Sequence, residues 1–167
     1  MFTLKTLSPD ALEAAIAKAE RYRLLNEPLE AASICEDVLL VAPDHRQALV
    51  WLLLSLTDQF GHNPQAVPQA VQVLSRIQDP YEKAYYSGIF WERRAKARYQ
   101  EGGLGGRQAA HYWLHSAMSF FEAAEKVRPH GNDDSLLRWN ACARFFMQHP
   151  ELQHEEQEEL GVPAMLE

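Results

Sequence analysis

The sequence is short of several features that would place a protein in a specialised class. It has two cysteines in 167 residues, too few for a disulfide framework, so Cys35 and Cys142 are expected to be reduced core residues. The net charge of −7 has the wrong sign for general binding to nucleic acid or to anionic lipid. Hydrophobic residues make up 47% of the chain, so a disordered polymer is not expected either.

The sequence also shows no pattern that predicts a targeting segment or a membrane-spanning segment. The first 15 residues lack a charged region followed by an apolar stretch, so they do not predict a secretory signal. The most apolar run, residues 48–56, is far shorter than the roughly 20 residues that span a bilayer. We therefore expect a cytoplasmic protein that does not bind membranes.

Strand patterns are scarce, whereas helical periodicity fills the chain. Asn26 is expected to end the first helix, and Asp44 is expected to cap the third. The third helix is apolar nearly all round, so other helices should cover it on several sides. Seven helices are expected, at 8–26, 28–42, 46–60, 65–77, 80–102, 107–127 and 135–148.

Two stretches of the sequence echo each other. "VAPDHRQALVW" and "VRPHGNDDSLLRW" both run from a valine and a proline through a polar turn to a leucine and a tryptophan. Pro43, Pro80 and Pro129, which end successive helix pairs, lie 37 and 49 residues apart. A tetratricopeptide unit has about 34 residues. The long fifth helix and the glycine-rich stretch 102–106 account for the extra length.

Small and aromatic residues recur where helices of such a unit should touch, because small residues let helix axes approach and large ones fill the gaps. On these residues the chain resembles the tetratricopeptide repeat family over roughly residues 10–147. The second unit departs from the pattern at Leu53, and in the third unit Gly88 or Ala95 could be the small site. The matching residues are Ala19, Tyr22 and Ala31 in the first unit and Ala117, Phe121 and Ala124 in the third.

The resemblance implies an all-α fold, a right-handed array of about three antiparallel helix pairs with a C-terminal capping helix. Residues 1–147 would form this domain, and 148–167 would be an acidic, partly disordered tail. Tyr22, Ala31, Trp51, Ala117, Phe121 and Trp139 are expected to be buried.

The resemblance also implies a protein-interaction module, an adaptor or scaffold that binds a peptide or protein segment in a concave groove. A self-associating structural protein, such as a homodimer, is the alternative. A nucleic-acid binder using Lys83, Arg93, Arg94, Lys96 and Arg98 is disfavoured by the overall charge. No reacting set of side chains is evident, so we do not expect an enzyme.

The groove is predicted on the fifth and seventh helices, where arginine side chains could hold the carboxylates of an acidic peptide. An ion pair to a neighbouring helix is the other interpretation of Arg93, and an ordinary polar face is the other interpretation of the stripe on the seventh helix. The acidic stretch 154–160 could compete for the same groove. The predicted groove residues are Tyr86, Arg93, Lys96, Asp133, Asn140 and Arg144.

Two further patterns in the sequence resemble ligand sites. His111 and His115 lie four residues apart on a helix, a spacing that can bind zinc, but no third ligand is evident and we expect two solvated histidines on a polar face. The stretch 102–106 followed by Arg107 could hold a phosphate, but it lacks the residues of a phosphate-binding loop and predicts a flexible connection. We therefore expect neither a metal nor a cofactor.

Overall fold

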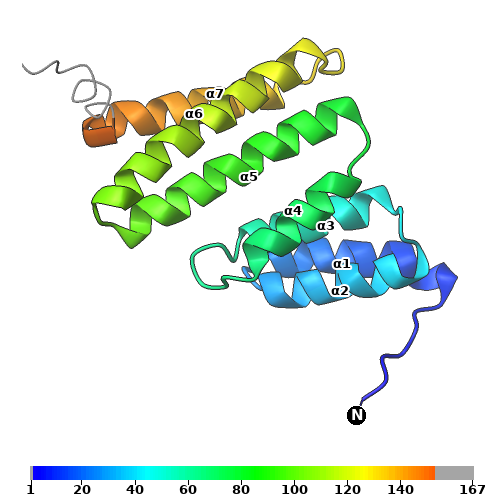
Figure 1. Ribbon diagram of the computed structural model, residues 1–167. Coiled ribbons are helices and arrows are strands. Elements are labelled where there is room, and N and C mark those ends of the chain that lie inside the picture. The colour runs from blue at the N-terminus through cyan, green and yellow to red at the C-terminus, as the bar shows by residue number, and fades with distance from the viewer. Residues whose placement is uncertain (1, 153–167) are drawn as a thin grey trace, which may run out of the picture. The chain divides into compact units, whose positions relative to one another are not determined.

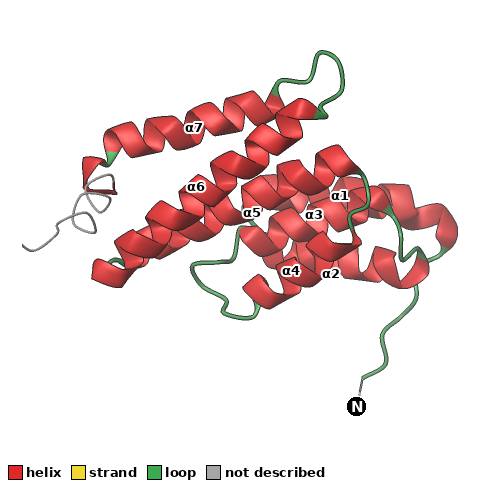
Figure 2. Cartoon of the chain, turned by 45° about the horizontal axis from the view of Figure 1, so that its top comes forward, coloured by secondary structure: helices red, strands yellow, loops and turns green. Residues whose placement is uncertain are grey.

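Prolines and one left-handed residue set several helix ends in the computed structural model, which describes residues 2–152. This part of the chain forms seven α-helices, two short 3-10 helices and no strand, so the expected all-α class is confirmed. The course of the helices can be followed in Figure 1 and Figure 2. In chain order the elements are η1 (Pro9–Ala11), α1 (Leu12–Leu24), α2 (Pro28–Val41), α3 (Arg46–Thr57), α4 (Ala66–Arg76), α5 (Pro80–Glu101), α6 (Leu104–Lys126), α7 (Asp134–Gln148) and η2 (Pro150–Leu152).

The helix ends follow from local chemistry. Pro28 and Pro80 begin α2 and α5, where a missing N–H costs no intrahelical hydrogen bond. Asn26 ends α1 as expected, with a φ of 62°. The next residue, Glu27, donates its N–H to the carbonyl of Tyr22 at 2.9 Å, which is the hydrogen bond of a left-handed helix cap.

The start of α3 differs from the expectation. His45, and not Asp44, caps this helix, because its Nδ1 accepts a hydrogen bond from the backbone N–H of Ala48 at 3.2 Å. The helix begins at Arg46, so Asp44 lies one residue too early to be the cap.

The chain divides into two units, Met1–Tyr86 and Ser87–Glu167, with the boundary inside α5. The sequence predicted one helical domain over 1–147 and did not indicate this division, because apolar helix pairs occur on both sides of it. Of the predicted tail 148–167, residues 153–167 lie outside the described part of the structure. None of the helices within residues 2–152 is long and apolar enough to cross a membrane.

In the first unit, α1 and α3 lie side by side and run in the same direction. Near the helix starts, His45 Nε2 is 3.5 Å from Glu13 Oε1, and near the helix ends Arg23 Nε donates to Asp58 Oδ2 at 2.8 Å. The helix between them in sequence, α2, packs against both, and α4 packs against α3. The Arg23 guanidinium also lies 5.8 Å from the ring centre of Trp51.

As expected, α3 is covered on several sides. Every residue from Ala48 to Thr57 is buried except Trp51, which is half-buried. Leu53, which stands where the repeat pattern favours a small residue, is fully buried. The apolar surface of α3 is therefore the centre of this unit's core.

In the second unit, α5 and α6 form an antiparallel pair. Gly88 lies under the ring of Phe121, and a Cβ atom added at Gly88 would come 2.6 Å from Phe121 Cδ1. Further along α5, the rings of Trp91 and Trp113 have centroids 6.1 Å apart. Ala95, the other candidate for the small site, is fully buried as well.

The link between α5 and α6 is shorter than expected. Gly102 and Gly103 have φ of 79° and 81°, a conformation that glycine adopts without strain, and they make the turn. The next helix starts at Leu104, three residues before the expected start, so Gly105 and Gly106 are helical. The predicted flexible loop is therefore a two-residue connection.

The six residues expected to be buried fall into two groups. Ala31, Ala117 and Phe121 are buried, whereas Tyr22, Trp51 and Trp139 are only half-buried. Tyrosine and tryptophan rings of this size commonly bury their apolar faces while the edge that carries the polar group stays at the surface. At that edge, Trp139 Nε1 donates to Glu122 Oε1 at 3.0 Å.

Candidate functional site

The six residues predicted to form a groove divide between the two units. Tyr86 belongs to the first unit and the other five belong to the second. Tyr86 is half-buried, and its ring meets that of Tyr85 edge-on with centroids 5.1 Å apart. Burial raises the pKa of Tyr86 to about 12, with a smaller contribution from the nearby carboxylate of Glu82. Its phenol is therefore neutral at ordinary pH.

In the second unit, α5 and α7 meet around a buried carboxylate that the sequence analysis did not single out. Glu92 is 1% exposed, and its Oε1 accepts from Lys96 Nζ at 2.6 Å. Its Oε2 lies 3.6 Å from Nη1 of Arg138 on α7. Burial raises the pKa of Cys142 to about 12, and the negative charge of Glu92 adds to this. Glu92 and its two cations thus form an ion-pair network across the contact between α5 and α7, here called the α5–α7 seam.

The seam continues towards the ends of both helices. Tyr99 packs edge-on against Phe145 with ring centroids 5.5 Å apart. The Tyr99 hydroxyl donates to Glu151 Oε1 at 2.5 Å and lies 2.9 Å from His149 Nδ1. The hydrogen bond from Tyr99 lowers the pKa of Glu151. Glu92 contacts Arg138, and Tyr99, which comes later on α5, contacts Phe145, which comes later on α7. The two helices therefore run in the same direction.

The structure does not bring the remaining predicted groove residues together at this seam. Asn140 and Arg144 are exposed, and each lies about 100° or more around α7 from every side chain that contacts α5. Asp133 is exposed and pairs with Arg128, Nη1 to Oδ1, at 3.0 Å. Arg93 is half-buried on α5. Of the predicted set, Lys96 contributes a contact to the seam, and the shared groove of Arg93, Asn140 and Arg144 stays a prediction.

A second cluster lies on α5 and α6, and of its residues only Arg94 stands out in the sequence, as one of several basic residues. The Arg94 guanidinium lies 4.2 Å from the ring centre of Trp113 on α6 and 5.4 Å from that of Trp91. Arg94 is half-buried, and desolvation lowers its pKa. No carboxylate among residues 2–152 pairs with it. Trp91 and Arg94 are three residues apart on one helix, which is the only signal of the cluster in the sequence.

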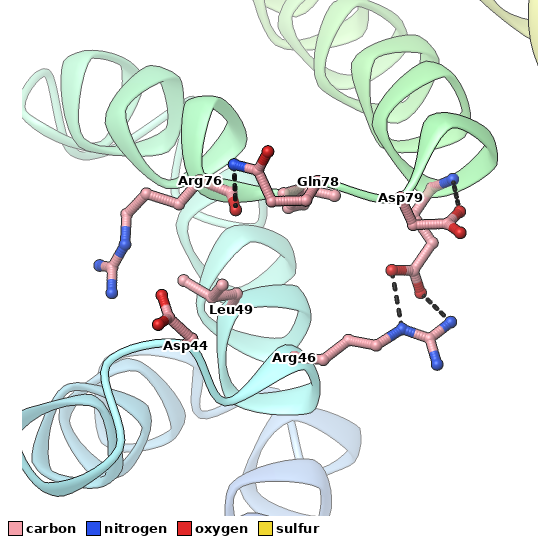
Figure 3. A pocket seen from close by; sticks show the side chains of 8 residues that line it. Asp44, Arg46, Leu49, Arg76, Gln78 and Asp79 are labelled. Carbon is pink, nitrogen blue, oxygen red and sulfur yellow. Dashed lines mark hydrogen bonds and ion pairs between the residues drawn. The ribbon is translucent and has the colours of Figure 1, made fainter.

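The first unit contains a cleft of about 190 Å³ at the start of α3, shown in Figure 3. Arg46 holds Glu82 through two hydrogen-bonded ion pairs, Nε–Oε2 at 2.8 Å and Nη2–Oε1 at 2.6 Å. Hydrogen bonding to Glu82 raises the pKa of Arg46. Arg76 Nη2 donates to the carbonyl of Pro43 at 2.5 Å. The lining residues are Asp44, Arg46, Leu49, Arg76, Ile77, Gln78, Asp79 and Glu82.

These contacts make the cleft a junction between helix ends. The backbone N–H of Glu82 donates to Asp79 Oδ1 at 2.9 Å, so Asp79 caps α5 while Glu82 reaches to α3. Four charged side chains of the cleft, those of Arg46, Arg76, Asp79 and Glu82, are therefore already engaged by the protein itself.

A larger hollow of about 580 Å³ lies at the turn between α1 and α2 and the link between α3 and α4. Its carboxylates outnumber its cations, and Leu29 on its edge is 63% exposed. The lining residues are Asn26, Glu27, Pro28, Leu29, Glu30, Asp58, Gln59, His62 and Asn63.

The two helical histidines of α6 are not equivalent. His111 is 5% exposed, and its Nδ1 donates to the carbonyl of Leu152 at 2.6 Å, so the expectation of a solvated His111 is wrong. The sequence could not show this, because the partner is a backbone atom 41 residues away. His115 is exposed. Within the described part of the chain, no three histidine, cysteine or acidic residues lie together as metal ligands could.

Comparisons with known proteins provide no relative: no family model matches the chain, and no curated protein or solved structure is significantly similar to it.

Proposed function

We propose that this protein is an interaction module that binds a segment of another protein, and that its helix pairs form a right-handed, tetratricopeptide-like array. The observation that carries the proposal is the parallel pairing of alternate helices. α1 runs beside α3 in the first unit, and α5 runs beside α7 in the second, each pair separated in sequence by one helix. Arrays of this kind present their first helices along one face, where a peptide can lie.

The residues between α1 and α3 suit such a role. Trp51 is half-buried with Arg23 above its ring, and the pair lies beside Asp58. Tryptophan and arginine are the side chains that most often dominate binding energy in protein interfaces. The same face therefore offers an aromatic surface with charges of both signs around it.

The proposal is tested by capturing partners on the immobilised full chain from the native host, purifying each one and measuring direct binding by calorimetry. Hydrogen exchange of the complex then locates the contact. We expect protection on α1 and α3 or on α5 and α7. Absence of any direct binder, or protection confined to α2, α4 and the outer side of α6, would overturn the proposal.

A matched pair of variants sharpens this test for a partner that protects α1 and α3. Trp51→Ala should weaken its binding, whereas Val71→Ser should not, because Val71 is exposed on α4. Both variants should first show an unchanged helical circular-dichroism signal.

Self-association is the second candidate, and one observation favours it. Leu137 and Met147 on α7 are 64% and 73% exposed, although both are large and apolar. A second copy of the chain could cover them. Light scattering of the full chain should then give a dimer mass that Leu137→Glu abolishes, whereas a monomer mass at high concentration would reject this candidate.

A further inference from the structure

Arg94 occupies an unusual environment for an arginine. It is half-buried, yet its contacts among the described residues are with the rings of Trp113 and Trp91 and with no carboxylate or carbonyl. Four other half-buried arginines each pair with an acidic side chain, namely Arg23, Arg98, Arg128 and Arg138. A guanidinium that loses water without gaining an anion is costly, and the cation–π contacts offset only part of this cost.

The surrounding charge is positive in a chain that is negative as a whole. Residues 91–98 contain Arg93, Arg94, Lys96 and Arg98 against the single acid Glu92. Glu92 is buried and turned to Lys96 and Arg138, so it does not neutralise Arg94. This segment therefore attracts a negatively charged partner, although the chain carries a net charge of −7.

We propose that Trp91, Arg94 and Trp113 form a binding site for an acidic segment of a partner protein, with a carboxylate of that segment held by the Arg94 guanidinium. The inference rests on the proposed interaction function and names the chemistry of the partner. When an aromatic ring covers the face of a guanidinium, the N–H groups along the edge of the guanidinium stay available. Two of these N–H groups can donate parallel hydrogen bonds to the two oxygens of a carboxylate. The rings of Trp91 and Trp113 hold the Arg94 side chain in place, so this side chain loses less conformational entropy when the acidic segment binds.

The composition of the site agrees with this assignment. Tryptophan and arginine are the residues most enriched among those that dominate interface energies, and here they are already in contact before a partner arrives. The indole rings also give apolar side chains of the partner a surface to cover. We therefore expect recognition of an acidic residue next to an aromatic or aliphatic one.

A single-stranded nucleic acid is the other anion that aromatic rings and arginine can hold. The structure favours the peptide, because two of the basic residues nearby are already engaged. Lys96 pairs with Glu92, and Arg98 pairs with Glu101. Too few free cations remain to follow a phosphate backbone.

The test is a selection of twelve-residue peptides from a randomised displayed library on the full chain, followed by fluorescence-polarisation titration of synthetic binders. We expect the binders to be enriched in Asp and Glu. Arg94→Gln should weaken their binding at least tenfold. Arg94→Lys should also weaken it, because an ammonium group cannot make the two-point contact.

The matched control is Arg21→Gln, which removes an exposed arginine from α1 in the first unit and should leave the affinity unchanged. Urea denaturation and the far-ultraviolet circular-dichroism spectrum must first show that Arg94→Gln folds as the parent does. If it does not, Trp113→Phe, which keeps an aromatic face beside Arg94, supplies the test, and it should reduce affinity in the same direction.

The outcomes separate this inference from the proposed function. Binders that lack acidic residues, or that bind Arg94→Gln as tightly as the parent, overturn the Arg94 site and leave the interaction function standing. Failure to obtain any binding peptide or direct protein partner overturns both. Tighter binding of oligouridylate than of any selected peptide, with loss in Arg94→Gln, overturns the peptide assignment in favour of RNA.

Discussion

The ring of Phe121 on α6 occupies the space where a side chain at Gly88 on α5 would begin. A Cβ atom at Gly88 would lie 2.6 Å from Cδ1 and 2.8 Å from Cζ of that ring, well inside contact distance. Phe121 is itself 1% exposed, so it lies in the close-packed interior, where neighbouring atoms limit its movement. The close approach of α5 to α6 therefore depends on the absence of a side chain at Gly88.

Gly88→Ala should destabilise the second unit by roughly 1–3 kcal/mol, because the added methyl group overpacks the crossing of α5 and α6. Urea unfolding followed by circular dichroism would measure the change. Gly105→Ala is the control, since a Cβ there meets nothing within 4 Å and alanine favours a helix. Equal stability of Gly88→Ala and the parent would contradict the observed packing.

Ala117→Leu should cost about 1–3 kcal/mol for the same physical reason. Ala117 is fully buried on α6, so a larger side chain has to displace its neighbours. Ala123→Leu on the exposed side of the same helix should leave the free energy of unfolding within about 0.5 kcal/mol of the parent. Similar losses for the two variants would show that the orientation of α6 is wrong.

Glu92→Gln should destabilise the protein by roughly 1–3 kcal/mol, because it removes the negative charge that Lys96 and Arg138 share in the α5–α7 seam. Glu101→Gln breaks an ion pair with Arg98 whose two side chains are 40% and 48% exposed, so its effect should stay below about 0.5 kcal/mol. Chemical denaturation of the two variants gives the comparison. A larger effect at Glu101 than at Glu92 would reject the network.

The two thiols should be unreactive in the folded protein. Burial raises the pKa of Cys35 and of Cys142 from 9.0 to about 12, so the nucleophilic thiolate is scarce at pH 8. Mass spectrometry after iodoacetamide treatment should find both residues unmodified without urea and both modified with it. Rapid labelling of either thiol without denaturant would show that its helix opens.

The same shifts predict how stability varies in alkaline solution. Because the folded pKa of each thiol exceeds the unfolded value, the folded state holds these protons more tightly. The contribution of the two protonated thiols to the stability of the folded state is complete below about pH 9 and is lost as the pH rises towards about 12. In Cys142→Ala this alkaline loss, measured by urea unfolding at several pH values, should be smaller than in the parent.

His111→Ala should loosen η2, because the imidazole N–H that holds the carbonyl of Leu152 is lost. Hydrogen exchange should accelerate at the amide of Leu152, which donates to His149 in the parent. His115→Ala, on the exposed side of the same helix, should change this exchange less. Unaltered exchange in His111→Ala would show that other contacts hold the turn.

Much of the helical framework could be predicted from local sequence, since the signals act within a few residues. Pro28 and Pro80 mark helix starts, and Asn26 marks an end through its left-handed backbone. The apolar periodicity of α3 identified a helix that its neighbours bury. The sequence predicts the start of α6 three residues too late. The low helix propensity of glycine is a small effect, and packing that favours a longer helix can outweigh it.

The candidate sites depended on contacts that local sequence does not encode. Arg94 meets Trp113 on another helix, and His111 bonds a carbonyl that is remote in the chain. Periodicity places a side chain on a face of its own helix but does not say which neighbour covers that face. Asn140 and Arg144 are both exposed on α7, and only packing decides that α5 contacts other side chains of that helix.

The sequence by itself thus determined where helices form and which residues are small enough for close crossings, because those properties arise from neighbouring residues. Tertiary structure alone decided that Glu92 is enclosed by two cations and that Arg94 has aromatic rings in place of an anion. Whether a charged side chain is neutralised depends on the distance to groups on other helices, and that distance is set only when the helices pack.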